Sequence, residues 1–231
     1  MKRLFFITLA VFMAFSMASC NKDENKDKDT VKYGEDGETP LPEAVDIGLG
    51  VKWSSFNLGA ENEYQFGLYY AWGELNYKVP FNDDNYTYKY DDTKDVSILP
   101  KNRDAAAKHL GENWRIPTKE DFQEIVDTFT DDDYTWKKET KTADDGTTIL
   151  LGWRVTSNVG KTKGNSLFFP AAGFYHEILG YDGNTGFYWT ANRYEEWPYN
   201  AWQFSVDENG PSIRHDGGRK YGCSIRPVYD K

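Results

Sequence analysis

The sequence is short of cysteine, of basic charge and of long hydrophobic runs. Only Cys20 and Cys223 occur in 231 residues, which excludes a disulfide-rich scaffold and leaves the fold to core packing. Lys and Arg number 27 against 37 Asp and Glu, a formal net charge of -10, so we expect no nucleic-acid partner. The apolar stretch from Leu4 to about Phe15 is shorter than the roughly 20 residues of a membrane-spanning helix.

Catalytic and metal-binding motifs are also missing. His109, His176 and His215 stand in no H-E-x-x-H or His-x-His spacing, which favours surface or hydrogen-bonding roles over zinc ligation. No EF-hand, P-loop or G-x-S-x-G pattern occurs. The adjacent acids Glu195 and Glu196 would point to opposite faces of a strand, which does not suit a glycosidase pair. We therefore expect no enzyme activity, no cofactor and no metal site, with weak calcium binding at acidic loops left open.

The N-terminus has the pattern of a secretory signal. Lys2 and Arg3 precede the apolar stretch, and mostly small residues follow it before Cys20. A cysteine at this point resembles the lipobox of bacterial lipoproteins, whose signal is cut before the cysteine. The resemblance implies that residues 1–19 are removed and that Cys20 is acylated. An ordinary signal peptide with an incidental cysteine is the alternative.

Residues 20–43 are expected to form the lipidated cysteine and a disordered acidic tether. After Cys20 this segment holds eight acids and four lysines, and Val31, Tyr33 and Leu41 are its only substantial apolar side chains. Its start, residues 21–25, resembles the Lys-and-acid export signal of Bacteroidetes lipoproteins. That resemblance implies an outer-membrane, lipid-anchored protein that faces the cell exterior, and a merely soluble linker is the alternative.

Residues 44–231 have the patterns of one α+β domain, with two helices in its first half and a strand-rich second half. One helix is predicted over 103–110. The second begins at Thr118, where Asp121 stands at the capping-box position. Its apolar face is predicted from residues that repeat at i, i+3, i+4 and i+7, namely Phe122, Ile125, Val126 and Phe129.

The predicted strands are short runs separated by turns. Trp202, Phe204 and Val206 alternate with polar residues, which predicts a half-buried strand. Cys223 is expected to be a buried, inert thiol. Residues 81–95 are predicted to be a long surface loop. The strands themselves are expected at 51–56, 67–72, 150–157, 166–169, 186–191, 201–206, 212–214 and 223–228.

Eight short motifs spread over 45–228 resemble the Fibrobacter succinogenes major paralogous domain of gut Bacteroidetes lipoproteins. They are VDIGL (45–49), VKW (51–53), NLGA (57–60), YAWGE (70–74), WRIPT (114–118), FPAAG (169–173), GFYWT (186–190) and SIRPV (224–228). The family is similar to the C-type lectin and formylglycine-generating-enzyme fold, so the resemblance implies that fold. Formylglycine-generating enzymes use a cysteine pair, whereas this domain has Cys223 alone. The calcium-binding motifs of sugar-binding C-type lectins are missing as well.

An aromatic and polar segment near the C-terminus is the candidate binding surface. Tyr194, Trp197, Tyr199 and Asn200 are the predicted ligand-binding residues, because rings that stack on sugars or anchor a protein occur in such loops. Core packing is the rival explanation for Trp197. The leading hypothesis is a surface-anchored, non-catalytic, adhesin-like module for an extracellular glycan or protein. A structural subunit or spacer of a surface assembly is the second, and a carbohydrate-active enzyme is the third.

Overall fold

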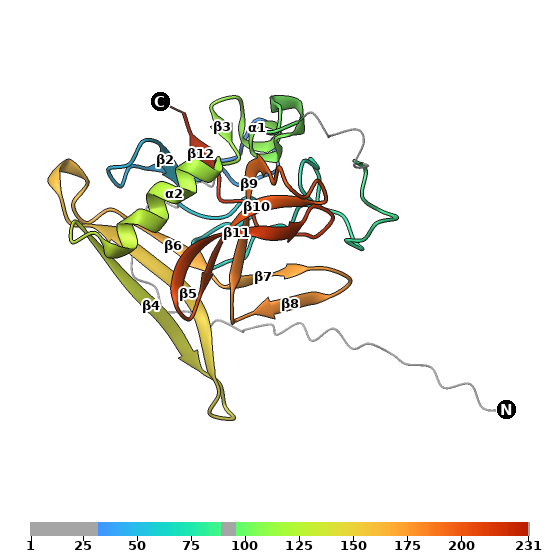
Figure 1. Ribbon diagram of the computed structural model, residues 1–231. Helices are drawn as coiled ribbons and strands as arrows, with labels where there is room; N and C mark the ends of the chain where they lie inside the picture. The colour runs from blue at the N-terminus through green and yellow to red at the C-terminus, as the bar shows by residue number, and fades with distance from the viewer. Residues whose placement is uncertain (1–31, 89–95, 231) are drawn as a thin grey trace, which may run out of the picture. The chain divides into compact units, whose positions relative to one another are not determined.

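The computed structural model describes residues 32–88 and 96–230, which form mostly strands with two α-helices (Figure 1). This sheet-rich α+β fold confirms the predicted class and the two helices of the first half. The predicted signal peptide, Cys20 and part of the loop predicted over 81–95 lie outside the described residues. In the part of the chain that is described, no helix is long and apolar enough to cross a membrane.

Three sheets make up the fold. A four-stranded sheet joins the beginning and end of the domain in the order β1 (Ala44–Val45), β2 (Lys52–Ser54), β12 (Val228–Tyr229) and β3 (Trp114–Arg115). A five-stranded sheet has the order β11 (Gly210–Gly218), β10 (Asn200–Asp207), β9 (Gly186–Arg193), β7 (Ala172–Tyr175) and β8 (Leu179–Asp182). A three-stranded sheet has the order β4 (Tyr134–Thr142), β5 (Thr148–Ser157) and β6 (Ser166–Pro170). All neighbours pair antiparallel except β7 and β9.

Both helices begin at capped N-termini. The Asp104 carboxylate accepts a hydrogen bond from the backbone N–H of Ala107 at the start of α1 (Ala105–Leu110). At α2 (Lys119–Asp127) the Thr118 hydroxyl and the Asp121 carboxylate form the predicted capping box. These local hydrogen bonds satisfy donors that a helix leaves unpaired at its first turn.

One face of α2 covers the five-stranded sheet (Figure 1). Phe122 stacks on Phe204 of β10 with ring centroids 4.5 Å apart and planes at 6°, and Ile125 is fully buried beside it. Phe129 was expected on this face. The helix ends two residues earlier, however, and Phe129 lies half-exposed in a 3-10 turn over Thr128–Thr130.

The core is rich in large rings, as the motifs predict. Trp53, Trp72, Trp114 and Trp189, each within one of the eight motifs, are all buried. Arg226, from the C-terminal SIRPV motif, is also fully buried and lies over the Phe169 ring. The core therefore contains a charge that must find its partners inside the fold.

Residues 32–43, which precede the predicted domain, make defined contacts with it. Tyr33 forms an isolated β-bridge with Pro40, and Leu41 packs against the buried cluster that includes α1. Asp36 Oδ2 lies 2.7 Å from Nδ1 of His109. The prediction of a disordered tether through residue 43 is therefore wrong for residues 32–43. The composition treats every acid of the segment as a solvated charge, whereas the Asp36 carboxylate is held by hydrogen bonds.

Several strand predictions also change. Residues 67–72 do not form the predicted strand, although Tyr70 makes an isolated β-bridge with Cys223. The strand expected over 223–228 is reduced to β12 and isolated bridges. Strand β4 was missed because it lies at a sheet edge, where its side chains are mostly exposed and no apolar alternation marks it.

Strand β10 is buried on both faces rather than on one. Phe204 faces α2, whereas Gln203 and Ser205 point to the other side, and all three are buried. Gln203 Nε2 donates to Cys223 Sγ at 2.9 Å, and the hydroxyl oxygens of Ser205 and Ser212 lie 2.9 Å apart. The prediction of a half-buried strand fails because these polar side chains find hydrogen-bond partners within the fold.

Candidate functional site

The four predicted ligand-binding residues lie on the connection between β9 and β10. Tyr194 directly follows β9, and Asn200 is the first residue of β10. The backbone N–H of Tyr194 donates to the carbonyl of Asn200 at 3.1 Å, and that of Asn200 donates to Trp197 at 2.9 Å. These bonds close a tight loop that lifts Trp197 and Tyr199 to its tip, with 59% and 45% of their surfaces exposed. Trp197 is thus outside the core.

The rings divide into two groups. Tyr194 stacks on His215 with ring centroids 4.7 Å apart, and Trp202 meets both rings edge-on at 5.2 and 5.7 Å. Lys119 Nζ lies 4.1 Å above the Trp202 ring, a cation–π contact. Trp197 and Tyr199 form a separate pair at 6.5 Å. The structure therefore packs Tyr194 against His215 and Trp202 and leaves Trp197 and Tyr199 as the exposed pair.

The polar groups of the loop bind one another. The Tyr194 hydroxyl donates to Glu196 Oε2 at 2.9 Å, and this hydrogen bond, with partial burial and the two nearby acids, raises the pKa of Tyr194. Trp202 Nε1 lies 3.4 Å from Glu195 Oε2. Asn200 Nδ2 donates to the carbonyl of His215 at 3.1 Å, so this amide fixes the loop to β11. The acids and Asn200 hold the conformation of the loop, and the rings of Trp197 and Tyr199 are its exposed apolar surface.

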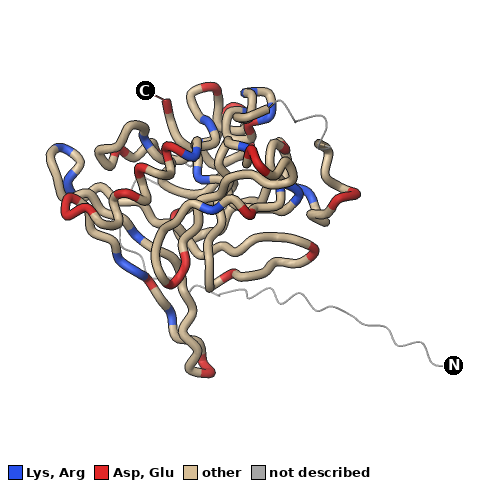
Figure 2. The backbone as a smooth tube through the Cα atoms, viewed as in Figure 1, with Lys and Arg blue, Asp and Glu red and all other residues tan. Residues whose placement is uncertain are grey.

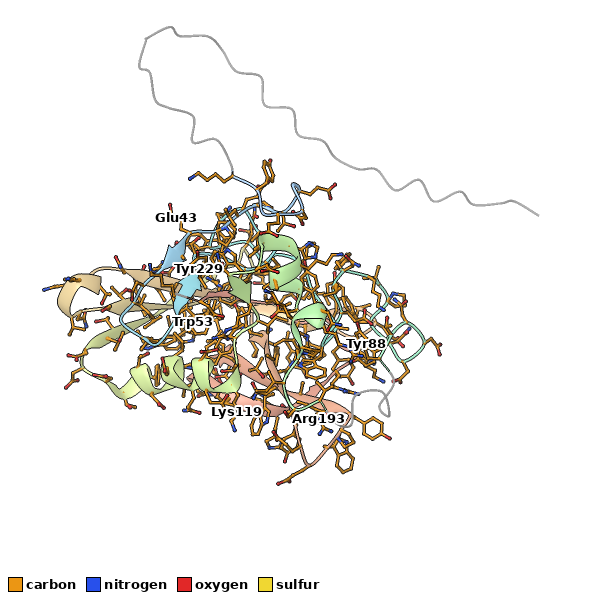
Figure 3. The ribbon with its side chains drawn as sticks, turned by 90° about the horizontal axis from the view of Figure 1, so that it is seen from above. Glu43, Trp53, Tyr88, Lys119, Arg193 and Tyr229 are labelled. Carbon is orange, nitrogen blue, oxygen red and sulfur yellow. The ribbon has the colours of Figure 1, made fainter. Side chains whose placement is uncertain are left out.

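A rigid frame fixes the base of the loop, where Arg193 and the nearby Lys119 are labelled in Figure 3. The backbone N–H of Arg193 donates to Ser97 at 2.9 Å, and its Nε donates to the carbonyl of Val96 at 3.0 Å. Asn192 Oδ1 accepts a hydrogen bond from the backbone N–H of Lys119 at 2.8 Å. A loop held in this way loses little conformational entropy when it binds a partner.

Cys223 occupies the position expected of an inert thiol. It is fully buried, and burial raises its pKa well above the usual range, even though the Gln203 amide donates a hydrogen bond to the sulfur. A thiol that stays protonated is a poor nucleophile. Within the described ranges, no group of three or more His, Cys, Asp or Glu side chains is placed to hold a metal ion.

A second concave region, which the sequence does not predict, lies on the face of the five-stranded sheet that points away from α2. It brings together Tyr181 of β8, Phe187 of β9, and Arg214 and Asp216 of β11. The only sequence signal was the i, i+2 spacing of Arg214 and Asp216, which puts both side chains on one face of a strand. Nothing local to Tyr181 indicates that it meets them, because the sheet topology decides that contact.

Figure 2 shows where charge lies on the described chain, with acidic residues at the turns of two hairpins. Asp144 and Asp145 lie at the β4–β5 turn, and Glu177 lies at the β7–β8 turn. Acids at these turns add negative charge to the most projecting backbone segments, where a polyanion would be repelled.

Comparisons with protein-family models, with curated proteins and with solved structures each found no match. The resemblance to the Fibrobacter succinogenes major paralogous domain therefore stays a prediction that depends on the eight motifs.

Proposed function

We propose that this protein is a lipid-anchored, non-catalytic binding module whose β9–β10 loop contacts a glycan or protein outside the cell. The observation that carries the proposal is the exposure of Trp197 and Tyr199 on a loop whose base is fixed by hydrogen bonds. Covering large exposed rings with a partner removes apolar surface from water, which favours binding. Such residues are enriched among interface hot spots.

The proposal includes a fold of the C-type lectin and formylglycine-generating-enzyme type. The positions of the motifs support it. Val228, from the C-terminal motif, pairs with Trp53 of β2 and Arg115 of β3, so three separate motifs meet in one sheet. The WRIPT motif provides β3 and the N-terminal cap of α2. These contacts give the motifs a structural reason to occur together.

We propose the outer membrane as the location, through lipid on Cys20, with the domain facing the exterior. Support comes from the signal pattern and the Lys-and-acid segment that follows it. Removing the two basic residues of the signal takes the formal charge from -10 to -12. Because anionic headgroups would repel such a chain, the acyl groups would supply the membrane affinity. Mass spectrometry of Cys20 and protease shaving of intact cells test these assignments.

The Trp197→Ala variant of the full chain tests the binding role. The purified variant and the parent protein are compared on a glycan array and in pull-down experiments with extracellular material. We expect retention to fall at least tenfold without a lower Tm, because the ring contributes little to the core. Tyr77→Ala is the matched control, since Tyr77 is a comparably exposed ring away from the loop, with 42% of its surface exposed. Equal retention by Trp197→Ala and the parent protein would reject the assignment.

Size-exclusion chromatography with light scattering separates this role from that of a structural subunit. A stable complex of the protein with itself that Trp197→Ala dissolves would assign the loop to an assembly interface. A monomer that retains a ligand would support the binding module.

A further inference from the structure

A cavity of about 310 Å³ lies on the face of the five-stranded sheet that points away from α2. Gln203 and Arg214, which pair across β10 and β11, are part of its lining. Phe204, the next residue of β10, points to α2 on the other face. The cavity is therefore separated by the sheet from the ring of Trp202, which shares the α2 face with Phe204. Its volume is at the lower end of the range typical of small-ligand sites.

Aromatic rings form one side of this cavity. Phe174 and Tyr181 stack with centroids 5.6 Å apart and planes at 16°. Phe187 meets them edge-on at 5.4 and 6.4 Å, and Tyr221 packs on Phe174 at 5.5 Å. Tyr181 is the outermost of them, with 61% of its surface exposed. The cavity thus offers a broad, partly open aromatic surface.

An ion pair also lines the cavity. Arg214 donates from Nε to Asp216 Oδ1 at 3.0 Å and from a terminal nitrogen to Oδ2 at 2.6 Å. The Arg214 hydrogen bonds keep the pKa of Asp216 below its usual value, so the carboxylate stays ionised at neutral pH. Arg214 also lies 6.0 Å from the centre of the Phe187 ring. Donors and acceptors therefore stand beside ring faces, with no net charge from the pair.

The backbone of Tyr181 carries conformational strain. Its φ of 63° is the one positive value outside glycine in the described chain, and an L-residue with a large side chain rarely adopts it. The next residues turn directly back, because the backbone N–H groups of Asn184 and Thr185 both donate to the Tyr181 carbonyl. Strained residues of this kind cluster at binding and active sites.

We propose that this cavity binds one pyranose ring of a neutral glycan. One face of a pyranose carries C–H groups, which pack on aromatic rings, and its edge carries hydroxyls that both donate and accept. The Tyr181 ring would contact the C–H face, Phe187 would border the sugar from the side because its ring stands at 79° to that of Tyr181, and the Arg214–Asp216 pair would bind vicinal hydroxyls. Asp207 also lines the cavity and adds negative charge, which disfavours acidic sugars. The inference concerns a different site from the β9–β10 loop and does not depend on the function proposed for that loop.

The test titrates the purified full chain with neutral gluco-, manno-, xylo- and galacto-oligosaccharides, by saturation-transfer NMR and then by calorimetry. We expect at least one series to bind. Tyr181→Gly, which removes both the ring and the strain, should lower the association constant at least tenfold, and so should Arg214→Gln. Tyr181→Phe should keep it within about threefold, because it keeps the ring. Ile178→Ala is the matched control on the same hairpin, with 77% of its surface exposed, and should bind like the parent protein.

Absence of binding to all four series would overturn the inference, and so would unchanged binding by Tyr181→Gly in a folded protein. Trp197→Ala distinguishes the two sites. If it alone abolishes sugar binding, the glycan binds the β9–β10 loop, the cavity proposal fails and the function proposed for the loop gains support. If Tyr181→Gly alone abolishes binding, the cavity is the sugar site whatever the loop does.

Discussion

Arg226 Nε donates a hydrogen bond to Asn57 Oδ1 at 2.9 Å, which joins two sequence motifs 169 residues apart. The other guanidinium nitrogens donate to the carbonyls of Ser54 and Phe168 at 3.1 and 2.6 Å. Arg226 is fully buried, and burial lowers its pKa to about 10, so it stays charged at neutral pH. The planar fork of one side chain thus connects β2, β6 and the segment before β12.

The first prediction follows from this contact. Arg226→Met should destabilise the fold by about 3–5 kcal/mol, because it leaves three buried acceptors without donors. Arg226→Lys keeps the charge and loses the fork, so it should also destabilise, by about 2 kcal/mol or more. Urea unfolding followed by circular dichroism measures both losses.

The Asn57 side chain offers a check on that explanation. Asn57→Ala in the Arg226→Met background should cost less than it does in the parent protein, since its partner is already gone. Additive losses in the double variant would show that the two side chains do not act through their hydrogen bond.

The second prediction concerns Asp36, in the segment that was expected to be a tether. Burial would raise its pKa, but hydrogen bonds from the Thr39 hydroxyl, from two backbone N–H groups and from His109 lower it well below the usual value. A carboxylate whose pKa is lower in the folded state stabilises the fold above its unfolded pKa, near pH 4, and loses this contribution as the pH falls toward the folded value.

Asp36→Asn should therefore lower the free energy of unfolding at pH 7. The loss should be about 1 kcal/mol, because the carboxylate still contacts solvent. The Tm of the variant should also fall less than that of the parent protein between pH 4 and pH 2. Thermal unfolding across that range measures the effect. If the variant and the parent protein lost the same amount of Tm between pH 4 and pH 2, this carboxylate would not hold the segment. Glu38→Gln, at an exposed position in the same turn, is the control.

The third prediction isolates the strain at Tyr181. Tyr181→Ala loses the stack on Phe174 and keeps the left-handed backbone, so it should destabilise by about 1–2 kcal/mol. Tyr181→Gly loses the same stack but relieves a strain of about 1 kcal/mol, so its stability should lie close to that of the parent protein. Chemical denaturation of the two variants measures the difference. Equal stability of Ala and Gly at this position would mean that the backbone there is not strained.

Features that depend on near neighbours in the chain can be predicted from the amino-acid sequence. The capping box at Thr118 and Asp121 was predictable because its hydrogen bonds span three residues, and Phe122 and Ile125 follow the helical period. The segment over 32–43 was not predictable, because composition counts Asp36 as solvated charge and cannot show that His109 lies beside it.

Contacts between side chains that are distant in the sequence depend on how the whole chain folds. Trp197 could have been in the core or exposed, and the hydrogen bonds between Tyr194, Trp197 and Asn200 placed it at a loop tip. The cavity beside Tyr181 exists because β8 and β11 lie at opposite edges of one sheet and both bring side chains over Phe187. Local propensity acts over a few residues, whereas a pocket needs strands from distant parts of the chain to take one particular order, and the packing of the whole core sets that order.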